Sequence, residues 1–196
     1  QDVCSSDLTL TIGTNGHLYD MQGELAFEQH QGSYDFVVDA WAREERAHYD
    51  AEYADGGWTT KDSLDTIDYQ KLWDMEASSR EYCSSVGEVA GKKVLLLGNG
   101  TSVKELSFVG LGAQVVFTDL SFQAVSYVKR RYQSSSLGRE LPNGCQFHAV
   151  NALHLPFQDD TFDVICADAL VHHIDDLQTL FKGIFRCLKP GGICRF

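Results

Sequence analysis

Several features that define other protein classes are missing from this chain of 196 residues. No apolar run is long enough to cross a membrane, so we expect no membrane partner. The six cysteines include no C-x-x-C pair, and the seven histidines do not lie at zinc-ligand spacing from them. We therefore expect reduced cysteines, no metal site and a cytoplasmic protein. Basic residues are also scarce, with 16 Lys and Arg against 28 Asp and Glu, and the net charge of −12 disfavours nucleic acid as a partner.

The familiar phosphate-binding motifs are missing too. The sequence has no G-x-x-x-x-G-K-[ST], which argues against a P-loop. The dinucleotide fingerprint requires a third glycine at the position of Val103, where a bulky side chain prevents close packing of a pyrophosphate on a helix. A Tyr-x-x-x-Lys pair is absent where a short-chain oxidoreductase would carry it. These absences disfavour NAD, FAD and nucleoside triphosphates as ligands.

What the sequence does contain is an apolar strand followed by a glycine turn. Residues 94–97, VLLL, have the length and bulk of a strand that is buried on both faces. The turn at 98–100, GNG, follows, and its two glycines allow a sharp bend and a close approach of the backbone to a ligand. Thr101 or Ser102 is then expected to cap a helix that runs through Leu111.

A second apolar run at 115–117 leads to Asp119, 21 residues after Gly98. At that place a carboxylate can accept hydrogen bonds from both hydroxyls of a ribose. Together with the missing phosphate motifs, this predicts a ligand that has a ribose but no phosphates. The alternative is an ordinary strand–turn–helix–strand unit in which Asp119 is simply exposed.

The rest of the chain continues the alternation of strands and helices. We expect helices at 121–133 and 175–188, and strands at 146–150, 162–167 and from Ile193. Strands that alternate with helices imply a parallel sheet with right-handed crossovers. The fold class is therefore α/β, a doubly wound, mostly parallel sheet with helices on both faces.

The first part of the chain is expected to add a helical extension to this domain. A short strand is predicted at 8–12, and amphipathic helices are predicted at 34–53 and 66–89, the first of them rich in aromatic residues and ended by the Asp-Gly-Gly at 55–57. No repeat or linker divides the chain, so we expect one domain. The basic cluster at 129–131 is expected to be the solvated end of a helix.

Four separated motifs indicate a family. They are NALHLPF at 151–157, DTFDVICA at 160–167, LVHHIDD at 170–176 and LKPGG at 188–192. In order and spacing they resemble the class I S-adenosylmethionine-dependent methyltransferases, particularly the branch that acts on small molecules, quinones and sugars. The resemblance implies a Rossmann-like fold, S-adenosylmethionine as cofactor, and an enzyme that transfers a methyl group to a small-molecule acceptor by in-line displacement.

The resemblance also implies how the chain is organised. Residues 1–88 are expected to form an N-terminal extension with a helical lid, and residues 89–196 a methyltransferase domain that is truncated in its fifth strand. Residues 1–8 resemble translated cloning sequence, to which we assign no function. A truncated sheet leaves an unpaired edge and an uncovered apolar face, so we expect the chain to be poorly soluble or partly folded when expressed alone.

The family pattern assigns roles to the residues at the strand ends. The glycine turn is expected to hold the methionine part of the cofactor, Asp119 the ribose and the loop at 151–153 the adenine. The segment after Ala167 is expected to line the place where the methyl group leaves. The aromatic helix resembles a lid that includes Tyr49, and the alternative is that its aromatic residues pack simply as core. The predicted cofactor-binding residues are Gly98, Asn99, Gly100, Thr101, Ser102, Asp119, Leu120, Asn151, Ala152, Leu153, Ala167 and Tyr49.

Three positions depart from the family pattern. Leu96 stands where the family usually has an acid that orients the amino group of methionine. Ser102 replaces a common glycine, and Asn151 replaces the usual Asp near adenine, although an amide can still accept and donate. Leu96 is the most serious departure, and it leaves open a methyltransferase-like protein that binds the cofactor without catalysis.

Three side chains are candidates for the chemistry itself. Methyl transfer from a sulfonium requires mainly that donor and acceptor are held in line and that water is excluded. A hydroxyl or phenol acceptor also benefits from a general base, and His172 or His173 has the side chain and the location for that role. Asp168 is a third candidate. The alternative for the histidines is packing beneath the following helix, and for Asp168 it is a solvated strand end.

Overall fold

The computed structural model describes residues 11–12, 18–19, 25–27, 29–30, 33–34, 40–54, 81 and 84–196. Several expectations fall outside these residues, namely the beginning of the strand at 8–12, most of the helix at 66–89, and the Asp-Gly-Gly at 55–57. The side chain of Trp41 also lies outside them. The described residues 85–89 are turn and irregular chain, so the prediction that this helix runs to 89 is wrong.

Short strands come first in the described part of the chain. β1 (Thr11–Ile12), β2 (Leu18–Tyr19) and β3 (Leu25–Phe27) form an antiparallel sheet, and β4 (Gln29–His30) pairs with β5 (Ser33–Tyr34). Helix α1 (Ala40–Ala54) follows. The prediction that this helix begins at Tyr34 is wrong, because Tyr34 pairs with Gln29 in the β4–β5 hairpin and so belongs to a strand.

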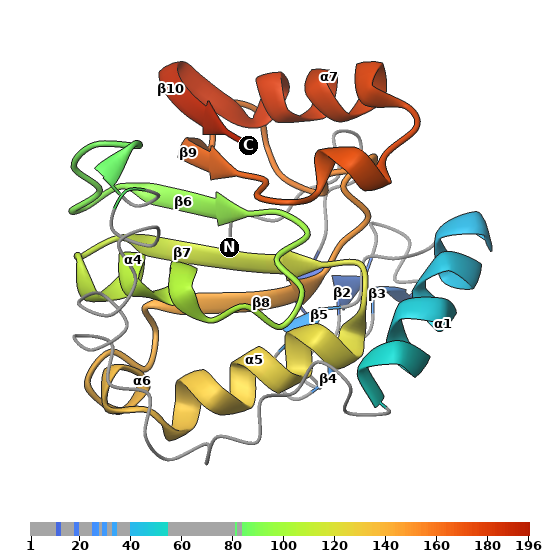
Figure 1. The fold of residues 1–196 in the computed structure, drawn as a ribbon, viewed down its shortest axis with the longest axis horizontal. Helices are drawn as coiled ribbons and strands as arrows, with labels where there is room; N and C mark the ends of the chain where they lie inside the picture. The colour runs from blue at the N-terminus through green and yellow to red at the C-terminus, as the bar shows by residue number, and fades with distance from the viewer. Residues whose placement is uncertain are drawn as a thin grey trace.

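Five parallel strands form the central sheet. They are β6 (Lys93–Leu96), β7 (Gln114–Asp119), β8 (Cys145–Ala149), β9 (Phe162–Cys166) and β10 (Leu188–Arg195). Figure 1 shows them in the order β10-β9-β6-β7-β8. The chain moves outward from β6 to β8 and then returns to the other side of β6, so the predicted doubly wound α/β fold is confirmed. The strand order reverses between β6 and β9, which is where such sheets bind ligands.

Helices connect the strands. They are η2 (Lys104–Leu106) and α4 (Ser107–Gly110) before β7, α5 (Phe122–Ser134) and α6 (Ser136–Glu140) before β8, and η3 (Val171–His173) and α7 (Leu177–Cys187) before β10. Helices α5 and α7 begin as expected. Ser121 Oγ accepts a hydrogen bond from the Ala124 N–H at 3.1 Å, and Asp176 Oδ1 accepts one from the Thr179 N–H at 3.0 Å. Each of these helices therefore has a side-chain N-cap.

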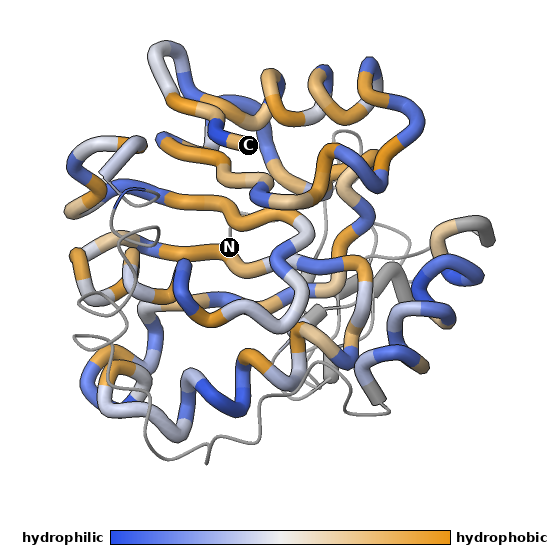
Figure 2. Tube along the Cα trace, in the orientation of Figure 1, coloured by the Kyte–Doolittle hydropathy of each residue, from blue (hydrophilic) through white to orange (hydrophobic). Residues whose placement is uncertain are grey.

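Alternate residues of the strands face opposite sides of the sheet and build two apolar cores. Val94 and Leu96 of β6 pack in a cluster with Phe108 of α4, while Leu95 packs in a second cluster with Leu180 of α7. Figure 2 shows the strands mainly in the apolar colour and α1 mainly in the hydrophilic colour. The runs that the sequence identified as buried strands are thus covered on both faces, whereas α1 is a polar helix.

The helix that follows the glycine turn is shorter than predicted. It begins at Lys104 with a 3₁₀ turn, and no side chain caps it. The Ser102 hydroxyl instead donates to the Glu105 carboxylate at 2.7 Å, so the prediction that Ser102 caps this helix is wrong. Leu111, the last residue of the predicted helix, lies after the end of α4 at Gly110 and is 41% exposed.

The segment at 134–138 contains the boundary between two helices. Its serines and glycine predict a break in the helix at 121–133, and α5 does end at Ser134, but the short helix α6 begins directly afterwards at Ser136. Ser135 Oγ accepts a hydrogen bond from the Gly138 N–H at 3.0 Å, which caps that helix. The serines therefore end one helix and begin the next.

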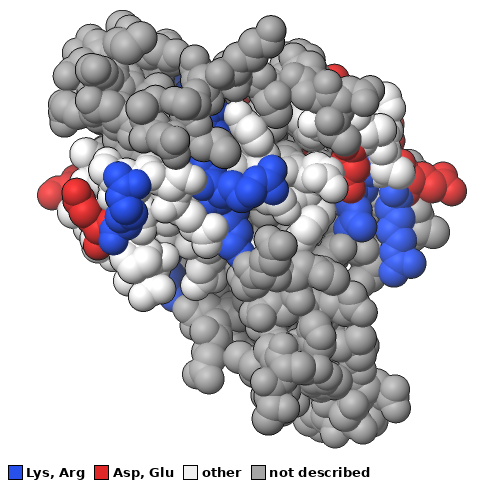
Figure 3. All heavy atoms as spheres, turned by 90° about the horizontal axis from the view of Figure 1, so that it is seen from below, with Lys and Arg blue, Asp and Glu red and all other residues white. Residues whose placement is uncertain are grey.

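The basic cluster on α5 is only partly solvated. Arg130 is exposed, but Arg131 is buried, and its Nη1 donates to the Tyr127 hydroxyl at 2.9 Å. Lys129 Nζ donates to Ser33 Oγ at 3.0 Å. The prediction of a solvated cluster is wrong for Arg131, because a residue four positions after Tyr127 lies on the same side of the helix. On the face shown in Figure 3, the described Lys and Arg side chains form separate groups.

Apolar side chains are exposed along α7 and β10, the edge strand of the sheet. Phe185 is 83% exposed, and the exposed rings of Phe181 and Phe196 pack edge to face with their centroids 5.2 Å apart. Among the described residues, no helix is both long enough and apolar enough to span a membrane.

Candidate active site

A cavity of about 460 Å³ opens beyond the carboxyl ends of β6, β7, β8 and β9. The glycine turn, the end of β7, residues 150–152 and residues of the segment 168–174 line it, and α1 adds a further wall. Its position is the crevice where the strand order reverses, and its volume lies within the range of about 300–1,000 Å³ that is usual for small-molecule sites. The fold therefore brings the four strand ends that the sequence identified into one cavity.

Most of the predicted site residues line this cavity. Thr101, Leu153 and Ala167 are the exceptions, since they are not among its lining residues. Ala167 is fully buried in the core beside α7, and Leu153 packs against the same core. The lining residues outside the predicted set are Glu45, Tyr53, Lys104, Glu105, Val150, Ala169, Leu170 and Ile174.

The glycine turn is covered closely by two side chains. Gly98 and Gly100 have positive φ angles of 60° and 55°, which glycine adopts without strain. A Cβ on Gly98 would lie 2.6 Å from Leu170 Cδ1, and a Cβ on Gly100 would lie 3.0 Å from the Tyr53 hydroxyl. The backbone angles therefore favour glycine at both positions, and a side chain at either one would also have to displace Leu170 or Tyr53.

Asp119 ends β7 inside the cavity and is bound by backbone amides. Its Oδ2 accepts the Gly100 N–H at 2.7 Å, and its Oδ1 accepts the Ser121 N–H at 2.8 Å. Only 8% of the residue is exposed. The alternative in which Asp119 is an exposed strand-end acid is therefore wrong. The carboxylate joins the glycine turn to the beginning of α5 and faces the cavity.

Burial raises the pKa of Asp119 to about 6. The hydrogen bonds from the amides of Ser121 and Gly100 act in the opposite direction, and the negative charge of Asp50 adds to the increase. At pH 7 the carboxylate is mainly ionised, so its oxygens are hydrogen-bond acceptors. A modest fall in pH is enough to protonate it.

Asn151 shapes the loop after β8. Its Oδ1 accepts the Leu153 N–H at 2.9 Å, and its Nδ2 lies 3.4 Å from His154 Nδ1. The side chain is nearly fully buried, and the residue lines the cavity together with Ala152. The amide expected to contact adenine is thus also the group that holds the backbone of this loop.

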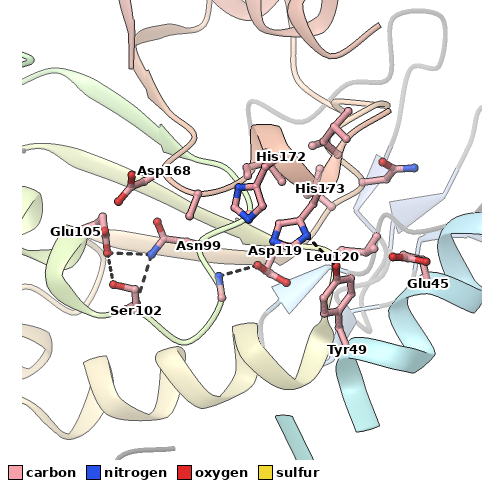
Figure 4. A pocket seen from close by; sticks show the side chains of 18 of the residues that line it. Glu45, Tyr49, Asn99, Ser102, Glu105, Asp119, Leu120, Asp168, His172 and His173 are labelled. Carbon is pink, nitrogen blue, oxygen red and sulfur yellow. Dashed lines mark hydrogen bonds between the residues drawn. The ribbon is translucent and has the colours of Figure 1, made fainter. Parts of the chain in front are cut away.

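A charged cluster lies beside the glycine turn (Figure 4). The Glu105 carboxylate is 1% exposed, and its Oε2 accepts Asn99 Nδ2 at 3.0 Å and the Ser102 hydroxyl at 2.7 Å. Lys104 Nζ lies 3.0 Å from Asp168 Oδ2 and 3.5 Å from Glu105 Oε1. Burial acts to lower the pKa of Lys104, but these two carboxylates raise it overall, so the lysine is a cation at neutral pH.

The two histidines lie on the other side of the cavity from that cluster, next to α1 (Figure 4). The rings of His172 and His173 are 4.0 Å apart between centroids. The Tyr49 hydroxyl is 3.5 Å from His173 Nδ1, and the two rings meet edge to face. Burial is the main cause that raises the pKa of Tyr49, so this phenol remains protonated at neutral pH.

Helix α1 covers the cavity and contributes little to the core. Figure 1 places it beyond the tip of β6, and of its described side chains only that of Ala42 is fully buried. Tyr49 and Tyr53 are half-buried and line the cavity. Burial, with a contribution from the charge of Asp119, raises the pKa of Tyr53 to about 12. Neither tyrosine is fully buried, and the lid remains a prediction.

The doubly wound sheet, the glycine turn and the acid at the end of the second strand define a protein with a nucleoside-type site. Residues 95–196 match the family model described as a methyltransferase domain. Since this match covers more than half of the chain, the chain belongs to the methyltransferase-domain family, and the resemblance predicted from its strand-end motifs is confirmed.

Two curated relatives illustrate the similarity. The chain is 27% identical to a demethylmenaquinone methyltransferase of Streptomyces griseus, over 78% of this chain and 63% of the relative. It is 34% identical to the ubiquinone/menaquinone biosynthesis C-methyltransferase UbiE of Haemophilus ducreyi, over 56% of this chain and 41% of the relative. The chain thus spans less than two thirds of the length of these relatives.

Solved structures share the fold at low identity. A geranyl diphosphate C-methyltransferase from Streptomyces coelicolor, solved with Mg²⁺, geranyl diphosphate and S-adenosylhomocysteine, is 17% identical, with a TM-score of 0.59 over 80% of this chain and 64% of that one. A putative S-adenosylmethionine-dependent methyltransferase from Methanococcus maripaludis is 16% identical, with a TM-score of 0.52 over 69% of this chain and 64% of that one.

Proposed function

We propose that this chain binds S-adenosylmethionine and transfers its methyl group to a small-molecule acceptor. The observation that carries the proposal is the buried carboxylate of Asp119, which faces the cavity at the reversal of the strand order. A carboxylate at the end of this strand is placed to accept hydrogen bonds from a ribose diol. Membership of the methyltransferase-domain family and the activities named for the relatives support the same ligand.

The lining of the cavity fits the chemical parts of this cofactor. Leu120 and Ala152 offer apolar surface to a base, and Asp119 offers acceptors to a ribose. Gly98 and Gly100 add no side chains of their own, and the side chains over them are those of Leu170 and Tyr53. When bound, S-adenosylmethionine supplies a methyl group on a positively charged sulfur that leaves as a neutral thioether.

The charge of the cavity also suits a cationic cofactor. Of the residues that the structure describes, four acids line it, Glu45, Glu105, Asp119 and Asp168, against one lysine, Lys104. At neutral pH this excess of negative charge attracts a sulfonium. The same charge disfavours a phosphate-rich ligand, which agrees with the absence of the phosphate-binding motifs from the sequence.

His173 is the residue to which we assign proton transfer. It lines the cavity and lies 3.5 Å from the Tyr49 hydroxyl, so a phenol from α1 orients its ring. Its Nδ1 or Nε2 would accept the proton of a hydroxylated acceptor, and the tilted ring of His172 packs against it. Asp168 is a weaker candidate for the base, because its carboxylate is already engaged by Lys104 at 3.0 Å.

We propose a flat, hydroxylated aromatic molecule such as a quinol as the acceptor. Rings from Tyr49, His172 and His173, together with Ile174, give this side of the cavity an aromatic and apolar lining. The net charge of −12 makes an anionic polymer an unfavourable partner. The relatives named for menaquinone and ubiquinone biosynthesis support an acceptor of this chemical class.

The test is transfer of a labelled methyl group from S-adenosylmethionine to 1,4-naphthoquinol by the purified chain. We expect label in the organic extract, and a rate lowered by roughly 10²–10⁴-fold in His173→Ala but not in a control variant at an exposed position far from the cavity, such as Arg130→Ala. Binding of S-adenosylhomocysteine without transfer to any phenol or quinol would instead identify a non-catalytic methyltransferase-like protein, the alternative that Leu96 favours.

A further inference from the structure

The proposed function gives the charged cluster beside the glycine turn no role in binding the ribose or the base. It consists of Lys104, Glu105 and Asp168, and all three line the cavity. In Figure 4, Glu105 and Asp168 lie at one end, and Tyr49 and Glu45 lie at the other, with Asp119 between them. The cavity therefore extends from the proposed ribose acceptor to a second polar end, where positive and negative groups are close together.

The structure excludes Leu96 from any polar role. Its side chain is fully buried in the apolar core with Val94 and Phe108, on the face of the sheet that α4 covers. At this position the family usually has an acid that orients the amino group of methionine, and Leu96 cannot take that role. If the chain binds an amino-acid group, other residues must supply the charges.

The buried carboxylate of Glu105 is hydrogen-bonded to Asn99 of the glycine turn and to Ser102 just after it. Two neutral donors, Asn99 Nδ2 and the Ser102 hydroxyl, hold its Oε2 at 3.0 Å and 2.7 Å. Its Oε1 faces Lys104 Nζ at 3.5 Å, and the same ammonium group lies 3.0 Å from Asp168 Oδ2. Two carboxylates from different strand ends thus converge on one cation at the edge of the cavity.

The backbone beside Asp168 supports this arrangement. Ala169 has a positive φ of 56°, a conformation that costs a residue with a Cβ free energy. The left-handed turn lies between Asp168, which pairs with Lys104, and Leu170, which covers Gly98. The segment is therefore held in an unfavourable conformation where it meets the glycine turn.

We propose that this cluster binds the amino-acid end of the cofactor: Glu105 and Asp168 bind the α-ammonium group, and Lys104 binds the α-carboxylate. The inference rests on the proposed function, since it takes S-adenosylmethionine as the ligand. The ammonium group of the ligand replaces the Lys104 ammonium between the two carboxylates, and the flexible lysine side chain moves to the ligand carboxylate. Each charge that the ligand brings then has a partner of opposite sign.

A pair of ligands tests this assignment without any turnover. S-Adenosylhomocysteine carries the amino-acid group, and 5′-methylthioadenosine has the same nucleoside and sulfur but lacks it. We would titrate both into the purified chain by calorimetry, and into Lys104→Met, Glu105→Gln and Asp168→Asn. Lys189→Met is the matched control, because Lys189 forms a similar ion pair with Asp163 at 2.9 Å, outside the cavity lining.

We expect each cluster variant to lower the affinity for S-adenosylhomocysteine by roughly tenfold to a hundredfold. The affinity for 5′-methylthioadenosine should stay within about twofold, and Lys189→Met should change neither. Asp119→Ala, by contrast, should weaken both ligands because both carry the ribose.

Two results would overturn the assignment. One is an unchanged affinity for S-adenosylhomocysteine in Lys104→Met and Asp168→Asn, whose half-exposed positions tolerate substitution. The other is an equal loss for both ligands in variants whose thermal unfolding matches that of the parent. Failure of the parent chain to bind either ligand would instead contradict the proposed function, so the two failures are distinct.

Discussion

Asp50 of α1 is hydrogen-bonded to Ser121 at the beginning of α5. Its Oδ1 accepts the Ser121 hydroxyl and, at 3.1 Å, the Gln123 N–H. The Ser121 N–H in turn donates to Asp119 Oδ1 at 2.8 Å. Helix α1 is therefore connected to the proposed ribose acceptor through one residue, and a change in α1 should be measurable at the cofactor site.

The pKa of Asp119, raised to about 6 mainly by burial, predicts how cofactor binding depends on pH. Above pH 6 the ionised carboxylate accepts hydrogen bonds from the ribose, and below pH 6 protonation weakens it as an acceptor. We expect the dissociation constant of S-adenosylhomocysteine to rise as the pH falls through 6, by up to about tenfold per pH unit. Calorimetry between pH 5 and 8 measures this, and a flat profile would contradict the role of Asp119.

Asp50→Asn should shift that pH profile. The charge of Asp50 contributes to the raised pKa of Asp119, so its removal should move the midpoint of the binding profile below that of the parent. Glu45→Gln is the control, because Glu45 also belongs to α1 and lines the cavity but is not among the causes of the raised Asp119 pKa. An unshifted midpoint in Asp50→Asn, or an equal shift in Glu45→Gln, would rule out the coupling.

The lid hypothesis predicts separate effects on binding and on stability. Tyr49 and Tyr53 line the cavity from α1, and their replacement by alanine would let water reach the sulfonium. We expect the double variant to raise the dissociation constant of the cofactor and to slow turnover, with a small change in thermal unfolding. If only thermal stability falls, while binding and rate are unchanged, the tyrosines have a packing role and the acceptor pocket lies elsewhere.

The burial of His148 leads us to predict a pH dependence of stability that does not involve the cofactor site. Burial, with the charge of Lys129, lowers the pKa of this β8 residue from 6.5 to about 4. Between these values the unfolded chain binds a proton that the folded chain excludes, so this histidine lowers the free energy of unfolding as the pH falls. The loss should reach about 2–3 kcal/mol at pH 4.5.

His148→Gln should remove that contribution. Urea unfolding at pH 7 and pH 4.5 gives the change in the free energy of unfolding for each chain, and the contribution of His148 is the parent's change minus the variant's. The comparison with the variant is needed because Asp119 also titrates in this range. Its raised pKa makes the folded chain bind a proton more readily than the unfolded chain, so between about pH 3.8 and 6 it increases the free energy of unfolding as the pH falls. An identical pH dependence in both chains would show that His148 does not titrate as its burial implies.

The sheet and the position of the site could be predicted because local patterns determine them. Apolar runs such as 94–97 are too bulky and too continuous for a surface, and Gly98 and Asp119 mark strand ends that a doubly wound topology brings together. Asp119 also shows the limit of such patterns. Its burial depends on Gly100 and Ser121, and a sequence alone does not distinguish that environment from an exposed turn.

The charged cluster was missed for a related reason. Spacing predicted residues 101–111 to be one helix with an apolar face, so Glu105 was not considered as a buried group. The Ser102-x-x-Glu105 spacing, which is typical of a capping box, was the available signal that the two side chains meet. The contact of Lys104 with Asp168 joins residues 64 positions apart, and no local pattern encodes it.

The central claim is that this cavity binds S-adenosylmethionine through Asp119. Calorimetric titration of S-adenosylhomocysteine and of NADH into the parent chain and into Asp119→Ala tests it most directly. We predict that S-adenosylhomocysteine binds the parent, that NADH does not, and that Asp119→Ala weakens binding by roughly 2–4 kcal/mol through the loss of two charge-assisted hydrogen bonds. Binding of NADH by the parent, or undiminished binding of S-adenosylhomocysteine by a folded Asp119→Ala chain, would contradict the claim.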